Sequence, residues 1–148
     1  MHALPALGRF HGLEHQFALR VYFEDTDLTG VVYHANYLRY MERARSDMLL
    51  AVGIDQRAAF EAGEGAYAIR GLKLDYQSPA RLGEELIVAS RLMSMRAAAV
   101  VIQQRVMRGQ TIVTAGEVEA AFVSPTGRPR RQPAAWIAAF EPLLWKGN

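Results

Sequence analysis

Residues 20–37, RVYFEDTDLTGVVYHANY, decide how the rest of this chain is organised. They place an acidic turn ending in a glycine between two apolar patterns of different period. Before the turn, residues 14–23 alternate apolar and polar side chains, which predicts a strand. After it, apolar residues recur every three or four positions and predict a helix of about five turns, with one face made of Tyr37, Met41, Ala44, Met48 and Val52. We expect Asp27 in the turn to be the central residue of the protein's chemistry. We expect the helix that follows it to contribute favourable electrostatic interactions there.

The polar side chains of this helix are expected on the opposite face, in solvent. They are Arg39, Glu42, Arg43, Ser46 and Asp47. Arg43 and Asp47 are four residues apart, so the spacing predicts an ion pair between them. Gly53 follows the last apolar residue and predicts the end of the helix there.

The remaining sequence predicts one antiparallel sheet. A short helix is expected over 55–62, and strands are expected over 72–77, 85–95, 97–107 and 110–123. The last three strands are joined by tight connections, which favour hairpins. A loop over 124–132 and a short helix over 133–140 close the chain. One long helix against one curved antiparallel sheet is an α+β fold. We expect a single domain over 14–148, preceded by a flexible arm over 1–13.

Composition narrows the class of protein. A chain of 148 residues is typical of one domain, and the absence of cysteine excludes disulfides and thiolate metal sites. The longest apolar run, 134–140, is too short to span a bilayer, and the N-terminus does not read as a secretion signal. We therefore expect a cytoplasmic protein without stable membrane insertion. The net charge is only +2 and no long basic run is present, which argues against nucleic-acid binding.

The acidic turn has two interpretations that its context disfavours. A calcium loop would need a bidentate glutamate where the chain has Asn36, so that interpretation is rejected. A D-x-D-x-T motif would make Asp25 the nucleophile of a magnesium-dependent phosphatase. Such enzymes need a parallel sheet and later acidic and lysine motifs, whereas this chain predicts antiparallel strands and contains two lysines.

A third interpretation comes from a family resemblance. The pattern Arg20-Val21, Thr26-Asp27, residues 30–34 and Asn36-Tyr37 resembles the signature of the 4-hydroxybenzoyl-CoA thioesterase family. Residues 25–45, DTDLTGVVYHANYLRYMERAR, are most similar to the Tol-Pal-associated acyl-CoA thioesterases. The resemblance implies a hot-dog fold, hydrolysis of an acyl-CoA to a free acid and CoA, no metal or other cofactor, and a homodimer or homotetramer joined at sheet edges.

Two residues carry the expected catalysis. Asp27 supplies the oxygen nucleophile or activates a water molecule. The first amides of the helix lack intrahelical partners, and one near His34 is the expected oxyanion donor, as the resemblance also implies. Two structural alternatives stay open: Asp27 as a cap of the following helix, and the His34 ring as a packed, satisfied side chain.

Substrate binding is expected from Tyr33 and from arginines in two loops. Arginine forks match phosphate oxygens, so these side chains are candidates for the CoA nucleotide, with a solvated surface as the alternative. The candidate arginines are Arg81, Arg128, Arg130 and Arg131.

Other roles on the same fold remain open. They are a non-catalytic acyl-thioester-binding or scaffold subunit and an enoyl-thioester hydratase, because a fold alone does not fix a function. Asp25 is expected to face solvent or a partner charge and, if close to Asp27, to raise its pKa. Asn36 is expected to bond the local backbone and Tyr37 to pack in the core, while His15 has no evident role.

Overall fold

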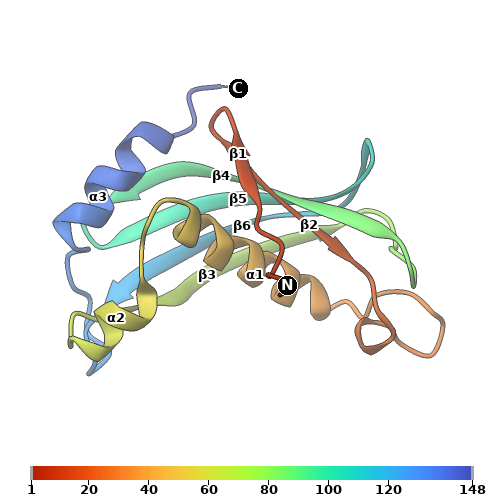
Figure 1. Ribbon diagram of the computed structural model, residues 1–148, viewed down its shortest axis with the longest axis horizontal. Coiled ribbons are helices and arrows are strands. Elements are labelled where there is room, and N and C mark those ends of the chain that lie inside the picture. Colours follow the sequence, from red (N-terminus) through yellow and green to blue (C-terminus); the bar gives the residue numbers. More distant parts are fainter. Residues whose placement is uncertain (1, 148) are drawn as a thin grey trace.

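A six-stranded antiparallel sheet curves around one long helix, as Figure 1 shows for the computed structural model, which describes residues 2–147. The strands lie in the order β1-β2-β4-β5-β6-β3, and every neighbouring pair is antiparallel. The predicted α+β architecture is therefore confirmed. The strands are β1 (Arg9–His11), β2 (Glu14–Arg20), β3 (Ala66–Tyr76), β4 (Glu85–Arg96), β5 (Ala99–Arg108) and β6 (Thr111–Val123).

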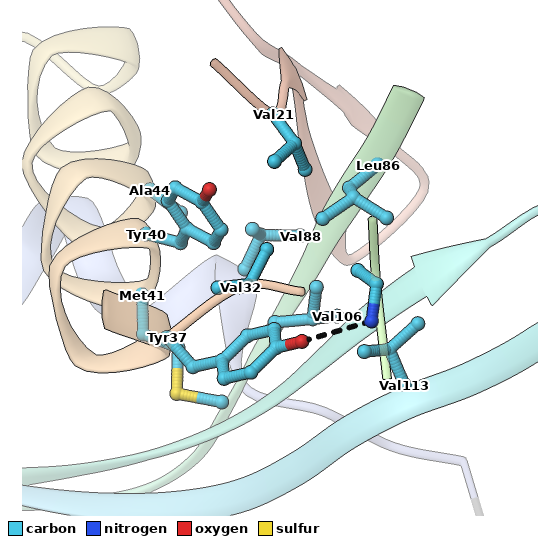
Figure 2. Packing of buried hydrophobic residues seen from close by; sticks show 11 residues of the cluster. Val21, Val32, Tyr37, Tyr40, Met41, Ala44, Leu86, Val88, Val106 and Val113 are labelled. Carbon is cyan, nitrogen blue, oxygen red and sulfur yellow. Dashed lines mark hydrogen bonds between the residues drawn. The ribbon is translucent and has the colours of Figure 1, made fainter. Parts of the chain in front are cut away.

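The central helix α1 (Asn36–Ala51) buries the face that the sequence predicted. Tyr37, Met41, Ala44 and Met48 are all at most 3% exposed. Figure 2 shows side chains of the first half of α1 packed against valines and a leucine of the strands and connecting segments. Burial of this apolar stripe fixes the helix against the concave face of the sheet.

The helix ends as predicted, and short helices complete the fold. Gly53 adopts a φ of +80°, the left-handed conformation that terminates helices at low cost for glycine. Asp55 caps the next helix by accepting a hydrogen bond from the Ala58 N–H at 2.9 Å. The remaining helical segments are α2 (Gln56–Glu61), α3 (Ala134–Phe140) and the 3-10 turns η1 (Phe23–Asp25) and η2 (Glu141–Leu143).

The N-terminal segment differs from the expected flexible arm, because residues 9–11 form β1 and pair with β2. The Gly8 N–H donates to Asp47 Oδ2 at 2.9 Å, which fastens the segment to α1. A three-residue strand is too short to show a period, so the pairing has no signature in the sequence.

The predicted exposure of Asp47 and its pairing with Arg43 are wrong. Asp47 is only 7% exposed, and its Oδ2 lies 2.9 Å from Nε2 of His15, which is fully buried. The β1-β2 hairpin covers this flank of the helix and brings in a partner from 32 residues earlier. Burial lowers the pKa of His15, although its hydrogen bond to the Asp47 carboxylate and the charge of that carboxylate oppose this.

This pair predicts a stability that depends on pH. A lowered pKa in the folded state means that the unfolded chain binds the His15 proton more readily. His15 therefore stabilises the fold above the unfolded-state pKa of about 6.5, and this contribution is lost as the pH falls. Urea denaturation should show a larger loss of unfolding free energy between about pH 7.5 and about pH 5.5 in the wild type than in His15→Gln.

His11→Gln is the matched control, since His11 is exposed on the neighbouring strand. It should keep the wild-type pH dependence. A His15→Gln variant that loses as much stability as the wild type over this interval would contradict the role assigned to the buried pair.

Candidate active site

The acidic stretch forms a tight backbone hairpin in front of α1. Thr26 and Val32 pair as an antiparallel bridge, and the Asp27 N–H donates to the Val31 carbonyl at 2.9 Å. The Gly30 N–H closes the tip by donating to the Asp27 carbonyl at 3.1 Å, with Gly30 at a φ of +80°. That backbone conformation favours glycine, and it places Asp27 at the start of the exposed tip.

The Asp27 carboxylate is exposed and held by one neighbour. Its Oδ1 accepts hydrogen bonds from the Thr29 hydroxyl at 2.6 Å and from the Thr29 N–H at 2.8 Å. The hydroxyl bond and then the amide bond lower the pKa of Asp27, since both favour the charged form. Asp25 is not among the groups that shift this pKa, so the condition for the expected rise, an Asp25 charge close to Asp27, is not met. Asp27 is also not the helix cap, because the N-cap of α1 is Ala35.

Asp25 joins the hairpin to the helix. Its Oδ2 accepts from the Tyr22 N–H and its Oδ1 from Asn36 Nδ2, both at 2.8 Å. Its carbonyl accepts from the Tyr33 N–H at 2.9 Å. Asp25 is half-buried and Asn36 is 8% exposed, so neither has the solvent-facing or purely local role that the sequence suggested. The Asp25 carboxylate therefore connects the turn to the first residue of α1 through two hydrogen bonds.

His34 lies two residues before α1 with its backbone N–H available. In the part of the chain that the structure describes, no acceptor takes this N–H. The His34 carbonyl accepts from the Tyr76 hydroxyl at 3.0 Å, which holds the peptide in place from β3. The imidazole is exposed and lies 4.6 Å from the Tyr33 ring, centroid to centroid, so it is not a buried, satisfied histidine.

A shallow groove of about 310 Å³ opens beside His34. Its walls include Tyr37, whose hydroxyl accepts from the Ala80 N–H at 3.2 Å (Figure 2). The other side is formed by Tyr76 and the turn that follows β3. The groove thus lies between the start of α1 and the end of the edge strand β3, with His34 among its lining residues.

Arg81 belongs to the same end of the molecule. Its backbone pairs with Val31 in a bridge, and the neighbouring Leu82 N–H donates to the Gly30 carbonyl at 3.1 Å. The Arg81 side chain is exposed, and within residues 2–147 no carboxylate lies within 4.0 Å of its guanidinium. The structure therefore places Asp27, Tyr33 and His34 on or directly after the hairpin and Arg81 in a backbone bridge with it, so all four lie at the same end of the molecule.

The other three candidate arginines lie at the opposite end of the sheet. Ala66 pairs with Val123 and Tyr76 with Thr114, so the loop after β6 is a full length of β3 away from Tyr76. That length is roughly 30 Å at the rise of an extended strand. Within this loop Arg130 is already engaged, since its guanidinium donates to the carbonyls of Gly63 at 2.9 Å and Glu64 at 2.7 Å. Arg128 and Arg131 are exposed.

Thr29 and Tyr76 contact candidate site residues in ways that the sequence did not predict. A threonine two residues after an aspartate is a known turn pattern, which was a usable signal for Thr29. Tyr76 is distant in sequence from His34, so only the fold reveals their contact. Among residues 2–147 the structure has no cluster of three or more histidine or acidic side chains arranged for a metal ion, and none of its helices is long and apolar enough to cross a membrane.

The chain is similar to proteins of a known family. A family model described as "Thioesterase-like superfamily" matches residues 21–140. An acyl-CoA thioester hydrolase, YbgC, of Escherichia coli is 37% identical over 128 residues, covering 85% of this chain and 95% of that protein. The acyl-CoA thioesterase YbgC of Helicobacter pylori is 38% identical over 134 residues, covering 84% and 96%.

A solved structure gives the same answer at the level of the fold. A probable thioesterase from Bartonella henselae superimposes with a TM-score of 0.77 at 32% identity, covering 81% of this chain and 99% of that one. The family model spans most of the chain, and the relatives are matched over nearly their full length. The chain therefore belongs to the thioesterase-like superfamily and has its hot-dog fold.

Proposed function

We propose that this protein is an acyl-CoA thioesterase that hydrolyses an acyl-CoA to a free acid and CoA. The observation that carries the proposal is the pairing of an exposed, ionised carboxylate at Asp27 with a free backbone amide at His34 in one short segment. The matched YbgC proteins are named as acyl-CoA thioesterases or thioester hydrolases, which supports the acyl-CoA as substrate. The cytoplasmic location expected from the sequence stays part of the proposal.

The chemistry needs a nucleophile and a site for negative charge. In one route the Asp27 carboxylate attacks the thioester carbon, CoA leaves as the thiolate, and water hydrolyses the resulting mixed anhydride. In the other, Asp27 takes a proton from a water molecule whose oxygen attacks the same carbon, and the tetrahedral intermediate then expels the CoA thiolate. Both routes consume one water, and the leaving thiolate takes up a proton.

The start of α1 suits the charge that develops on the carbonyl oxygen. The His34 N–H can donate to that oxygen, and the positive end of the helix dipole lies beside it. An exposed carboxylate is ionised at neutral pH, and the lowered pKa of Asp27 extends its ionised form to more acidic pH. A non-catalytic scaffold subunit would need neither feature, which is why we favour the enzyme.

Replacing the central carboxylate tests this function. Asp27→Asn keeps the size of the side chain but removes the negative oxygen, so turnover of a panel of acyl-CoAs should fall ~10²–10⁴-fold. The measurement is release of the CoA thiol by the purified variant.

Glu24→Gln is the control, because Glu24 is an exposed acid in the same segment and should retain wild-type turnover. Wild-type rates in a folded Asp27→Asn variant would rule out the assigned role. Addition of water to an enoyl-CoA without thiol release would instead establish the hydratase.

We also propose a homodimer or homotetramer built at the free edge of β3. This strand ends the sheet, and its unpaired edge region exposes Ile69 (52%), Leu72 (46%) and Tyr76 (48%). An exposed edge with apolar side chains favours pairing with a second copy. In a single chain the loop arginines are far from the groove, so they can approach a catalytic site only on a neighbouring subunit of an assembly. Arg81 already lies at the same end of its own chain as the groove.

The prediction is that the protein forms an assembly in which the nucleotide is held by Arg81 and by loop arginines of a neighbouring subunit. Light scattering should give two or four times the 16.5 kDa of one chain. Arg81→Gln and the double variant Arg128→Gln/Arg131→Gln should raise KM for an acyl-CoA and leave kcat nearly unchanged, because the nucleotide is remote from bond breaking.

An acyl-pantetheine substrate, which lacks the nucleotide, is the control and should be unaffected by either variant. Arg130 is left in place because it holds two backbone carbonyls. A fully active single chain would exclude the shared site. Equal losses on both substrates, or no loss on either, would return these arginines to the solvated surface.

A further inference from the structure

A second, separate cavity lies beneath the later turns of α1. It encloses about 110 Å³ between this helix and strands β3, β5 and β6. Met48, Val100, Ile102 and Phe140 give it a mainly apolar lining. None of its lining residues belongs to the groove beside His34. The space is large enough for several water-sized groups or a short hydrocarbon segment.

A buried glutamine fixes one charged side chain at this cavity. Gln104 is fully buried on β5, and its Nε2 donates to the Met41 carbonyl at 3.0 Å and to Ser90 Oγ at 2.9 Å. With both amide hydrogens engaged, Oε1 is left to accept from Arg45 at 2.8 Å. The amide thus has one orientation, and it anchors the guanidinium that lines the cavity.

The charge on Arg45 has no counter-ion in the part of the chain that the structure describes. Arg45 is half-buried, and among residues 2–147 no carboxylate lies within 4.0 Å of it. Burial lowers its pKa, and the more distant charge of Glu42 opposes this only in part. Its single described hydrogen bond goes to Gln104, whereas a guanidinium offers five N–H donors. A carboxylate beside this guanidinium would favour its charged form and offset the cost of its partial burial.

We propose that this cavity binds a carboxylate carried on a short hydrocarbon stem, with Arg45 holding the carboxylate and the apolar walls enclosing the stem. A guanidinium fork matches the two oxygens of a carboxylate, and the bond to Gln104 uses only Nη1 of Arg45, so its other N–H donors have no described partner. Glu42 also lines the cavity and its negative charge opposes an anionic ligand, so the contact with Arg45 has to outweigh this repulsion.

Two molecules carry this chemistry. One is an acyl-CoA whose acyl chain ends in a second carboxylate, and this source rests on the proposed function. Arg45 follows Asn36 by nine positions, which is about 14 Å along the helix axis and within reach of a medium-length chain. The other is a free carboxylic acid, such as a reaction product. Both use the same contact with Arg45.

The test for binding compares hexanoate with hexan-1-ol, which has the same stem without the charge. In a methyl NMR titration, hexanoate should shift the Met48 and Ile102 methyls and bind about tenfold or more tightly than the alcohol, as expected for a charge-assisted contact. The methyl of Met93, which lies outside the cavity lining, should not move. Arg45→Met should abolish the difference, and Arg43→Met, an exposed arginine on the same helix, should keep it.

The wild-type comparison stands even where Arg45→Met fails to fold. Equal affinity for hexanoate and hexan-1-ol, or shifts confined to residues outside the cavity, would overturn the proposal, as would a charge preference that persists in folded Arg45→Met.

A kinetic arm separates the two sources. If the substrate supplies the carboxylate, Arg45→Met should lower kcat/KM for 6-carboxyhexanoyl-CoA about tenfold and leave heptanoyl-CoA unchanged, while Arg43→Met changes neither. If the free acid is the ligand, the titration succeeds and neither substrate is affected by the Arg45 change. A wild type that releases no thiol from any acyl-CoA would refute the proposed function and leave the titration result to decide the site.

Discussion

The geometry of the candidate site depends on two hydrogen bonds that the Asp25 carboxylate accepts. One oxygen accepts from the Tyr22 N–H behind the turn, and the other accepts from Asn36 at the first position of α1. Through these hydrogen bonds the hairpin that carries Asp27 is tied to the start of α1, beside the amide of His34. The separation between the proposed nucleophile and the proposed oxyanion donor then depends on local backbone geometry, which is the kind of preorganisation that the proposed catalysis requires.

The central helix serves more than one purpose along its length. Its start lies beside the free amide of His34, and its buried stripe holds the concave face of the sheet together. Further along, the Asp47 carboxylate accepts a hydrogen bond from the Gly8 N–H and is hydrogen-bonded to His15. These bonds fasten the N-terminal hairpin to the side of the helix. On another flank Arg45 lines the second cavity and donates a hydrogen bond to Gln104, which holds it in place. The candidate reaction site and the candidate carboxylate site are therefore linked by one rigid element.

The sequence predicted those parts of the structure that repeat or that form locally. The spacing of Tyr37, Met41, Ala44 and Met48 predicted α1, and tight connections predicted the three-strand meander β4-β5-β6. Strand β3 begins at Ala66 rather than at residue 72, because an edge strand with a bulge after Ile69 does not alternate regularly. The sequence carried no signal for contacts between residues that are far apart along the chain, such as Asp47 with His15 and Tyr76 with His34. It also carried no signal that Arg128 and Arg81 lie at opposite ends of the sheet.

A crystal structure of Asp27→Asn with an acyl-CoA bound tests the proposed site most directly. We expect the thioester oxygen at ~2.7–3.1 Å from the His34 nitrogen, the distance expected of an oxyanion donor. We also expect the residue 27 side chain on the face of the carbonyl carbon from which attack occurs. A thioester bound away from the start of α1, or a His34 N–H taken by an acceptor of the protein itself, would contradict it.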